Sequence, residues 1–527
     1  MTLAPRFLIE LWTGYKVRRF ARGLKAQGRG VAAQKASFRK LMAQFARTEF
    51  GQQHKLTART SYEEFSAAVP PRTYDYFQPL VQRMFTGAAD VLLPGTCHFY
   101  VETAGTLGLK PKLLPVPDAM LEHYRRGLQD TLFLYIAKMG NAGVFLGRHV
   151  HAGPSTAIKQ EGNVYQTGLD GILTFALSPW AEANLRSPAL DVANLPEGPL
   201  KTEAIVKEMR TLDVTLVAGA PAAICDLAVA CRNAAGTGEE APPHLQALLP
   251  NLECLLYTGA PAGLYAELLR LWVGPNVNFH ELYAAAEGIF AASDDGQPAA
   301  LRLLTDIGLF FEFIPLRDFN EKTLTEDRAL CRPLEQVQTG VDYVLVLTSP
   351  AGLCRYVIGD IVRFVSVEPP RILFVGRTAC QLNAFGEHVS ERELVETLVA
   401  VCVRNGWQAV NFHVAPYQRR VAAGQNISCH EWWIELGTHT IKTPTANVLA
   451  PELDAELARR NGDYAARRTS RHIGSPSVRL VVPGVFEEWA IGRKKISGAS
   501  KMPRCRSDRQ IAEQIAALAH FHPDTEM

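Results

Sequence analysis

The 527-residue chain has almost no charge imbalance: 55 Lys and Arg residues stand against 53 Asp and Glu residues, a formal net charge of +2. It therefore has no overall electrostatic field that would attract nucleic acid, and nucleic-acid binding is a poor first prediction. No apolar run approaches the roughly 18 residues of a membrane span. Met1 to Arg22 hold no signal-peptide core; we expect an amphipathic helix packed on the body there, with a surface membrane anchor as the alternative.

Cysteine is sparse and dispersed. Ten Cys lie between Cys97 and Cys505, and no two of them form a Cys-x-x-Cys pair. In a chain this long without an export signal, such residues are expected to be reduced and mostly buried thiols. We therefore predict a cytoplasmic protein.

The motifs of several common enzyme classes are missing. Neither His280-Glu281 nor His430-Glu431 is followed by the second His of a HExxH zinc site. No Gly-x-Ser-x-Gly elbow occurs, and no strand runs into Gly-x-Gly-x-x-Gly. Serine hydrolysis and hydride transfer therefore have no support from the sequence.

What the chain does contain is an alternation of short apolar runs with helical stretches. Residues 215–217, 254–257 and 343–347 are typical of strands, whereas residues 33–47, 222–233 and 264–272 are typical of helices. This alternation predicts an α/β fold. Gly-Ala-Pro turns follow two of the strands, where open α/β sheets place ligands.

The length predicts more than one domain, and a border is favoured near Gly376-Arg377, where a strand over 372–375 ends. We expect a large N-terminal α/β domain over 1–375. A smaller α+β domain over 376–527 would follow, with capping boxes at Ser390-x-x-Glu393 and Ser507-x-x-Gln510.

Two segments have the residue types of a nucleotide site. Thr103 to Lys112 is rich in Gly and Thr and ends in Lys, which suits a triphosphate, although a Gly-rich turn is the more ordinary reading. Tyr283 to Gly288 presents Glu287, a hard oxygen ligand for magnesium. A surface Glu that opens a helix explains Glu287 equally well.

Two further segments complete the set. Asp360, directly after Gly359, could accept hydrogen bonds from both hydroxyls of a ribose, or be a simple β-turn Asp. Lys501, on a Gly/Ser-rich stretch, is either solvated or a charge placed for a transition state. Taken singly, each of the four segments favours its structural explanation.

Further short motifs follow one another along the chain. They are Arg47-Thr48-Glu49-Phe50-Gly51, Val69-Pro70 with Tyr74, Arg83-Met84-x-x-Gly87, Leu93-Pro94-Gly95, Gly219-Ala220-Pro221, Phe310-Phe311-Glu312-Phe313-Ile314-Pro315, Ala351-Gly352-Leu353-Cys354-Arg355-Tyr356, Gly376-Arg377 and Lys501-x-Pro-Arg504. In order and spacing, they and the four segments resemble the acyl-acid amido synthetases of the auxin-responsive GH3 type. These belong to the adenylate-forming superfamily.

The resemblance implies a reaction. Members of the family join a carboxylic acid to ATP with Mg²⁺, release pyrophosphate, and let an amine, commonly an amino acid, attack the acyl-adenylate. The implied roles are phosphate binding for Thr103, Gly105, Thr106 and Lys112, adenine contact for Tyr283, magnesium for Glu287, ribose for Asp360, nucleotide contact for Arg377, and catalysis for Lys501. The resemblance also implies that the domain over 1–375 binds the nucleotide and the acyl acid, with an acyl pocket from side chains between about Leu113 and Ala223, and that the domain over 376–527 carries the catalytic Lys501.

The sequence also departs from the family pattern. Ala104 and Leu107 stand where the phosphate loop usually has Ser, and Ala284 to Ala286 stand where Gly, Ser or Thr is usual. Asn383 to Glu387 looks closer to bacterial members. Two alternatives therefore stay open: a ligase that passes the acyl group to a thiol such as coenzyme A or a carrier, and an inactive member that acts as a binding protein.

Overall fold

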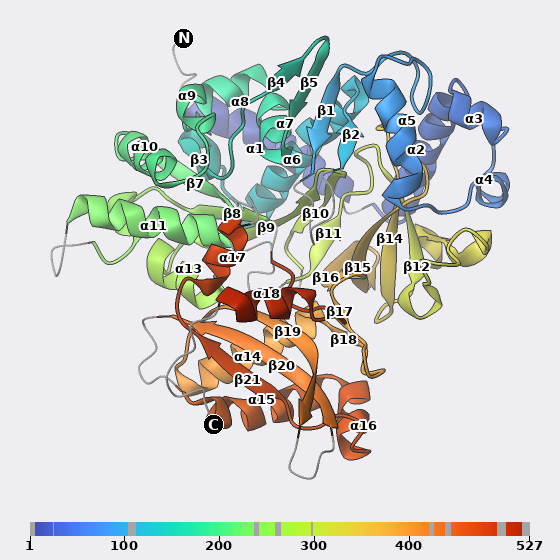
Figure 1. Ribbon diagram of the computed structural model, residues 1–527. Coiled ribbons are helices and arrows are strands. Elements are labelled where there is room, and N and C mark those ends of the chain that lie inside the picture. Colours follow the sequence, from blue (N-terminus) through green and yellow to red (C-terminus); the bar gives the residue numbers. More distant parts are fainter. Residues whose placement is uncertain are drawn as a thin grey trace. The chain divides into compact units, whose positions relative to one another are not determined.

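The structure is a computed structural model that describes residues 6–24, 26–103, 112–236, 242–258, 265–296, 299–420, 426–437, 444–492 and 502–518. The chain divides into two compact units (Figure 1). The first comprises Met1–Gly259 and Arg270–Leu373, and the second comprises Ala260–Leu269 and Phe374–Met527. The binding functions assigned to residues 1–375 and 376–527 stay predictions.

A sheet of twelve strands dominates the first unit. Its order is β13-β12-β14-β15-β16-β11-β10-β9-β8-β7-β3-β6. In chain order these strands are β3 (Arg148–Ala152), β6 (Arg186–Ser187), β7 (Val214–Gly219), β8 (Cys254–Thr258), β9 (Asn278–Ala285), β10 (Gly288–Ser293), β11 (Leu301–Leu303), β12 (Phe310–Pro315), β13 (Arg332–Pro333), β14 (Asp342–Thr348), β15 (Tyr356–Val367) and β16 (Pro370–Arg377).

The pairing of neighbouring strands in this sheet changes from parallel to antiparallel at β9. From β6 through β3, β7 and β8 to β9 the neighbours pair in parallel, whereas β9 pairs antiparallel with β10 and β10 with β11. Parallel strands need both faces covered, which explains the nearly continuous burial of β7. The predicted α/β alternation is confirmed: the strands expected over 215–217, 254–257 and 343–347 lie in β7, β8 and β14.

A smaller sheet has the order β2-β1-β5-β4. Its strands are β1 (Phe99–Glu102), β2 (Leu113–Pro115), β4 (Lys159–Glu161) and β5 (Val164–Thr167). Because β1 and β2 pair antiparallel, the sequence that joins them starts and ends at the same edge of this sheet. That sequence is the predicted phosphate loop.

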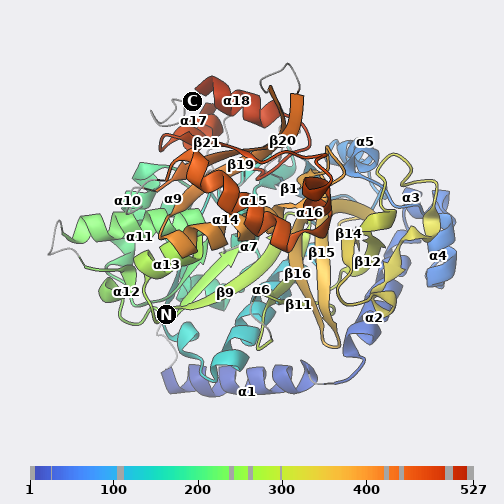
Figure 2. The same cartoon turned by 90° about the horizontal axis from the view of Figure 1, so that it is seen from below.

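Helices flank these sheets. They are α1 (Arg6–Leu24), α2 (Arg29–Phe45), α3 (Glu49–Gln53), α4 (Tyr62–Ala68), α5 (Tyr74–Phe85), α6 (Asp118–Met139), α7 (Leu169–Phe175), α8 (Pro179–Asn184), α9 (Leu190–Ala193), α10 (Pro199–Met209), α11 (Pro221–Ala235) and α12 (Leu245–Leu248), with α13 (Ala266–Val273) across the division between the units. The expected helix over 33–47 is α2, which begins earlier and ends at Phe45. The expected N-terminal helix is α1, which packs against α6 (Figure 2). None of the helices described is both long and apolar enough to cross a bilayer.

The second unit holds a three-stranded sheet, β19-β20-β21, and the pair β17-β18. Its elements are β17 (Gln381–Leu382), β18 (Val389–Ser390), α14 (Glu391–Asn405), β19 (Ala409–Arg420), β20 (Asn426–Leu436), α15 (Ala446–Arg460), α16 (Gly462–Thr469), β21 (Ser477–Val481), α17 (Val485–Gly492) and α18 (Gln510–Leu518). The capping box at Ser390 and Glu393 is confirmed. The one at Ser507 is wrong, because Ser507 donates to the carbonyl of Gln381, and Asp508 accepts the amide of Gln510 instead.

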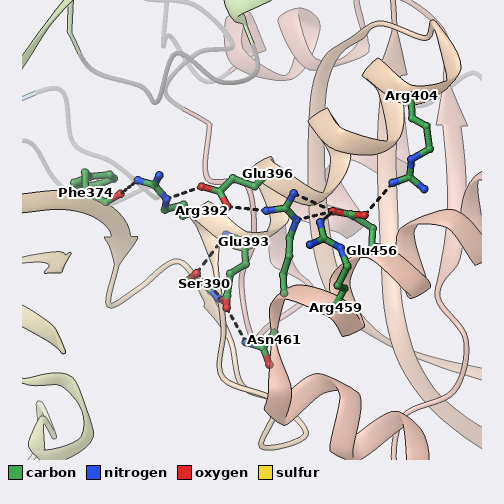
Figure 3. A network of polar contacts seen from close by, with 10 residues as sticks. Phe374, Ser390, Arg392, Glu393, Glu396, Arg404, Glu456, Arg459 and Asn461 are labelled. Atoms are coloured by element: carbon green, nitrogen blue, oxygen red, sulfur yellow. Dashed lines mark hydrogen bonds and ion pairs between the residues drawn. The ribbon is translucent and has the colours of Figure 1, made fainter. Parts of the chain in front are cut away.

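An ion-pair network joins α14 to α15 (Figure 3). Glu456, only 6% exposed, accepts hydrogen bonds from Arg404 at 2.9 Å and from Arg460 at 2.9 Å. Arg460 also donates to Glu396 at 2.9 Å, and Glu396 accepts from Arg392 at 2.7 Å. Such a connected set fixes two helices better than isolated surface pairs do, so we assign it a structural role.

A buried ion pair ties strand β12 to the residue just before β15. The guanidinium of Arg355 reaches Glu312 at 3.1 Å and 3.0 Å, and both side chains are fully buried. Arg355 also donates to the carbonyl of Val69 at 2.7 Å, and Tyr62 donates to Glu312 at 2.8 Å. The φ of Arg355 is +48°, a conformation that L residues adopt only when their surroundings compensate for its cost.

We predict that Glu312→Gln lowers the free energy of unfolding by about 3–5 kcal/mol, because it leaves the Arg355 charge buried without its counter-ion. Glu49→Gln is the matched control, since the Glu49–Arg83 pair is about half exposed on both sides and should cost less than about 1 kcal/mol. Urea unfolding of both variants measures the difference. Equal losses would contradict the role given to the buried pair.

Candidate active site

The first predicted site residue stands where the large sheet changes direction. Glu287 lies in the turn between β9 and β10, next to Gly288, whose φ is +149°. The alternative reading, that this Glu opens a helix, is wrong, because strands lie on both sides of it. The turn follows the carboxyl end of a parallel strand, which is where such sheets place ligands.

Helix α6 fixes the backbone on both sides of this turn. The hydroxyl of Tyr124 donates to the carbonyl of Ala286 at 2.7 Å, and the amide of Ile289 donates to Nε2 of His123 at 2.9 Å. Because Nε2 accepts, Nδ1 carries the proton and donates to the carbonyl of Ile307 at 2.9 Å. The imidazole is thus neutral, and burial lowers the pKa of His123 to about 4. Sequence analysis missed both side chains, since they occupy ordinary core positions of a helix.

The second predicted residue, Asp360, lies inside β15 and not in a turn, so the β-turn alternative is also wrong. The register between β14 and β15 shifts at this point, with three residues of β15 opposite Leu345. Gly359 has a φ of +89° in this bulge. A bulge re-aims the side chain beside it. Here Asp360 accepts a hydrogen bond of 2.6 Å from the hydroxyl of Tyr283 on β9.

Tyr356 connects the remaining predicted residues. Its hydroxyl donates to Oε1 of Glu287 at 3.2 Å and accepts from Nζ of Lys112 at 2.8 Å. Burial and then the charge of Glu287 raise the pKa of Tyr356 well above its usual value, so its phenol keeps the proton. This tyrosine was quoted only as part of a motif, and its role as the link was missed.

The backbone around Tyr356 is held from one segment. The amide of Arg72 donates to the carbonyl of Arg355 at 3.0 Å, and the amide of Val357 donates to the carbonyl of Arg72 at 2.8 Å. These bonds lie on either side of Tyr356, and Arg355 is anchored by its ion pair with Glu312. The buried pair therefore fixes the residue that reaches Glu287.

The two ends of the predicted phosphate loop are paired. The amide of Thr103 donates to the carbonyl of Lys112 at 2.8 Å, and the amide of Lys112 donates to Oγ1 of Thr103 at 3.0 Å. Gly105 and Thr106 lie outside the described residues. The loop thus begins and ends beside Lys112, whose ammonium is directed to Tyr356 and so toward Glu287.

The second unit carries the other two predicted residues. Arg377 ends β16, and its carbonyl accepts the amide of Cys380 at 2.9 Å. Lys501 lies outside the described residues. The sequence that follows it runs along β19: Val414 donates to the carbonyl of Arg504 at 2.8 Å, and the ring of His413 bonds the carbonyl of Pro503 at 2.8 Å.

The side chains present suit a magnesium ion that substrate phosphates also bind, and not one bound by protein side chains alone. Among the described residues no group of three or more His, Cys, Asp or Glu side chains could hold a metal ion. Glu287 offers one carboxylate. Magnesium at phosphate-transfer sites is commonly bound by one or two carboxylates together with substrate phosphates, so the residues present fit that mode of binding.

Three family models match the chain and together cover more than half of it. They are the GH3 family N-terminal domain over residues 24–164, the GH3 family central domain over 302–377, and the GH3 family C-terminal domain over 392–510. The matched stretches contain Thr103, Lys112, Asp360, Arg377 and Lys501, but not Tyr283 or Glu287.

Curated relatives match along most of their length. The chain is 24% identical to indole-3-acetic acid-amido synthetase GH3.8 of Oryza sativa subsp. indica, over 93% of this chain and 91% of the relative. It is 22% identical to indole-3-acetic acid-amido synthetase GH3.3 of Arabidopsis thaliana, over 93% and 92%.

Solved structures show the fold. The structure of GH3.15 acyl acid amido synthetase matches with a TM-score of 0.70 at 17% identity, over 97% of this chain and 98% of that one. A 2-hydroxyisobutyryl-CoA ligase matches with a TM-score of 0.60 at 14% identity, over 93% and 92%. The expected α/β fold is confirmed, and it is shared with these synthetase and ligase structures.

We predict that the first unit loses stability as the pH falls from about 6.5 toward about 4. Burial lowers the pKa of His123, His149 and His280 to about 4. Below about pH 6.5 the three rings bind protons in the unfolded chain, whereas in the folded chain they stay neutral until the pH approaches 4. The stabilisation of the folded state by these neutral rings is therefore full above about pH 6.5 and is lost as the pH falls toward about 4. Each ring contributes up to about 3 kcal/mol.

Thermal melts across this pH range measure the effect, with His123→Gln as the comparison. The variant should melt lower than the parent near neutral pH and lose less on acidification, because one titrating ring is gone. Parallel curves for the two proteins would mean that His123 does not titrate in this way.

Proposed function

Since the chain belongs to the GH3 family, we propose that it is an ATP-dependent acyl-acid amido synthetase, a ligase that forms carbon–nitrogen bonds. It joins a carboxylic acid to ATP with loss of pyrophosphate and transfers the acyl group from the adenylate to an amine, which we take to be an amino acid. Adenylation replaces a poor leaving group by AMP. The protein's share of the work is to position the reactants and to stabilise phosphate charge.

One observation carries this proposal: three segments far apart in the chain meet through three side-chain hydrogen bonds. Lys112 reaches Glu287 through Tyr356, and Tyr283 bonds Asp360. A phosphate loop, a magnesium ligand and a ribose ligand must lie this close together to bind one ATP molecule. Unrelated surface turns have no reason to do so.

The roles are those that the family resemblance implies, and the residue types suit them. Thr103, Gly105, Thr106 and Lys112 bind the β- and γ-phosphates, Tyr283 lies beside the adenine, and Asp360 binds the ribose hydroxyls. Glu287 holds the magnesium ion that neutralises phosphate charge when it is bound. The hydrogen bonds from Lys112 through Tyr356 keep the Lys112 ammonium near the Glu287 carboxylate. The phosphates would then bind beside a positive charge.

Two residues of the second unit complete the proposal. Lys501 is the catalytic lysine, whose positive charge would stabilise the negative charge that grows on the acyl carboxylate and α-phosphate during adenylation. Arg377 contributes to nucleotide binding. Both roles rest on the family resemblance.

The amine acceptor is preferred to a thiol because the curated relatives matched over most of their length are named amido synthetases. Catalysis is preferred to inactive binding because Glu287 and Asp360 are both present and both held by hydrogen bonds. We place the reaction in the cytoplasm, because all ten cysteines are free and buried, as a reducing compartment would leave them.

The direct test is a panel of carboxylic acids incubated with the purified protein, ATP and Mg²⁺. We expect pyrophosphate release with at least one class of acid, and mass spectrometry should then find an amide once amino acids are added. A thioester formed with coenzyme A, and no amide with any amine, would favour the thiol alternative. ATP binding by calorimetry without turnover of any acid would favour the inactive alternative.

We predict that Glu287→Gln and Asp360→Asn each lower the rate of pyrophosphate release by about 100- to 1000-fold while the protein stays folded. Glu281→Gln is the matched control, because Glu281 lies on β9, the strand that leads into the Glu287 turn, and accepts a hydrogen bond of 3.0 Å from Tyr257. Steady-state kinetics against ATP and Mg²⁺ measure the effect. Loss of activity in the control as large as in Glu287→Gln would remove the special role of that carboxylate.

A further inference from the structure

Helix α1 has two unlike faces. Ile9, Thr13 and Val17 are buried and follow one another at intervals of four residues, which places them on one side of the helix. Further along that side, Phe20 packs edge-on against Phe133 of α6, with ring centroids 5.6 Å apart. One side of α1 is therefore fixed to the first unit, and the other is presented to solvent (Figure 2).

The solvent side of α1 is strongly apolar at its beginning. Phe7 and Leu11 are each 63% exposed, Tyr15 is 58% exposed and Trp12 is 55% exposed. Fifteen large hydrophobic side chains are exposed among the described residues, and these four lie within nine residues of one another. Isolated exposed apolar side chains are ordinary, but a continuous group of aromatic residues marks an interaction surface.

The same side becomes basic toward its end. Arg18 and Arg22 continue the line of Phe7, Leu11 and Tyr15 at spacings of three and four residues, and both are exposed. Lys16 and Arg19 are exposed on the flanks, whereas Glu10 is the one acidic residue of α1. Nζ of Lys16 lies 3.9 Å from the ring centroid of Trp12. The surface thus joins aromatic rings to four cations.

We propose that this face of α1 attaches the protein to an anionic phospholipid surface. The rings of Phe7, Trp12 and Tyr15 enter the headgroup boundary, and the arginines pair with lipid phosphates. Trp, Phe and Leu together with Arg and Lys are the residue types by which helices lie at a membrane interface, through buried apolar area and attraction to anionic lipids. In α1 the rings stand at the start of the exposed face and the cations toward its end. The charge argues against a second copy as the occupant, because two such faces would bring like charges together.

This surface is separate from the candidate active site. The match to the N-terminal family model begins at residue 24, so it includes only the last residue of α1, Leu24. The attachment uses no residue of the candidate active site, so it holds or fails whether or not the amido synthetase assignment is correct.

The test is co-sedimentation of the full chain with vesicles of phosphatidylcholine alone or of phosphatidylcholine mixed with phosphatidylglycerol. We expect binding to the mixed vesicles, weakening with salt, with a blue shift of tryptophan fluorescence. The combined substitution Arg18→Gln, Arg19→Gln and Arg22→Gln should lower the partition coefficient by on the order of 100-fold. Leu11→Ser with Trp12→Ser should abolish both the binding and the blue shift.

Leu200→Ser is the matched control, since Leu200 is 78% exposed on α10, and it should bind the mixed vesicles as the parent does. Sedimentation velocity without lipid measures whether the protein self-associates through α1. The proposal is overturned if neither kind of vesicle binds, or if the arginine variant partitions as the parent does. It is also overturned if the parent self-associates through α1 and Leu11→Ser with Trp12→Ser only makes it monomeric.

Discussion

The candidate site depends on one hydrogen-bonded chain, from the ammonium of Lys112 through the phenol of Tyr356 to the carboxylate of Glu287. A cation, a neutral donor and an anion in this order stabilise one another where an unpaired buried charge would be costly. This series of hydrogen bonds joins the end of the predicted phosphate loop to the turn between β9 and β10. In the proposed function, this is where phosphate and magnesium would be bound together.

The rest of the first unit holds that chain in place from several sides. The buried pair of Arg355 and Glu312 and the backbone bonds to Arg72 fix the residues beside Tyr356. His123 and Tyr124 of α6 fix the backbone on either side of Glu287. None of these groups needs to touch a substrate. They keep the geometry of those that do, which is what transition-state stabilisation by fixed charges requires.

The departures from the family pattern can be understood in this light. Ala284 and Ala285 belong to β9, where small side chains suffice because Tyr283 and Asp360 supply the polar contact. Gly359 is required by the φ of the bulge that aims Asp360, which ties this glycine to the site and not merely to a turn. The surface of α1 is a separate matter, since it uses exposed rings and cations and no part of this network.

The sequence alone determined the α/β class, the strands at β7, β8 and β14, and the family, because apolar periodicity and motif order are local and linear properties. It did not determine that Glu287 stands in a strand turn, that Asp360 lies in a bulge, or that Ser507 fails to cap α18. Those outcomes depend on which partner each polar group finds. The link through Tyr356 was likewise decided only by tertiary structure, because it joins residues separated by 244 and by 69 positions. No local pattern records a contact that exists only once the sheets have packed.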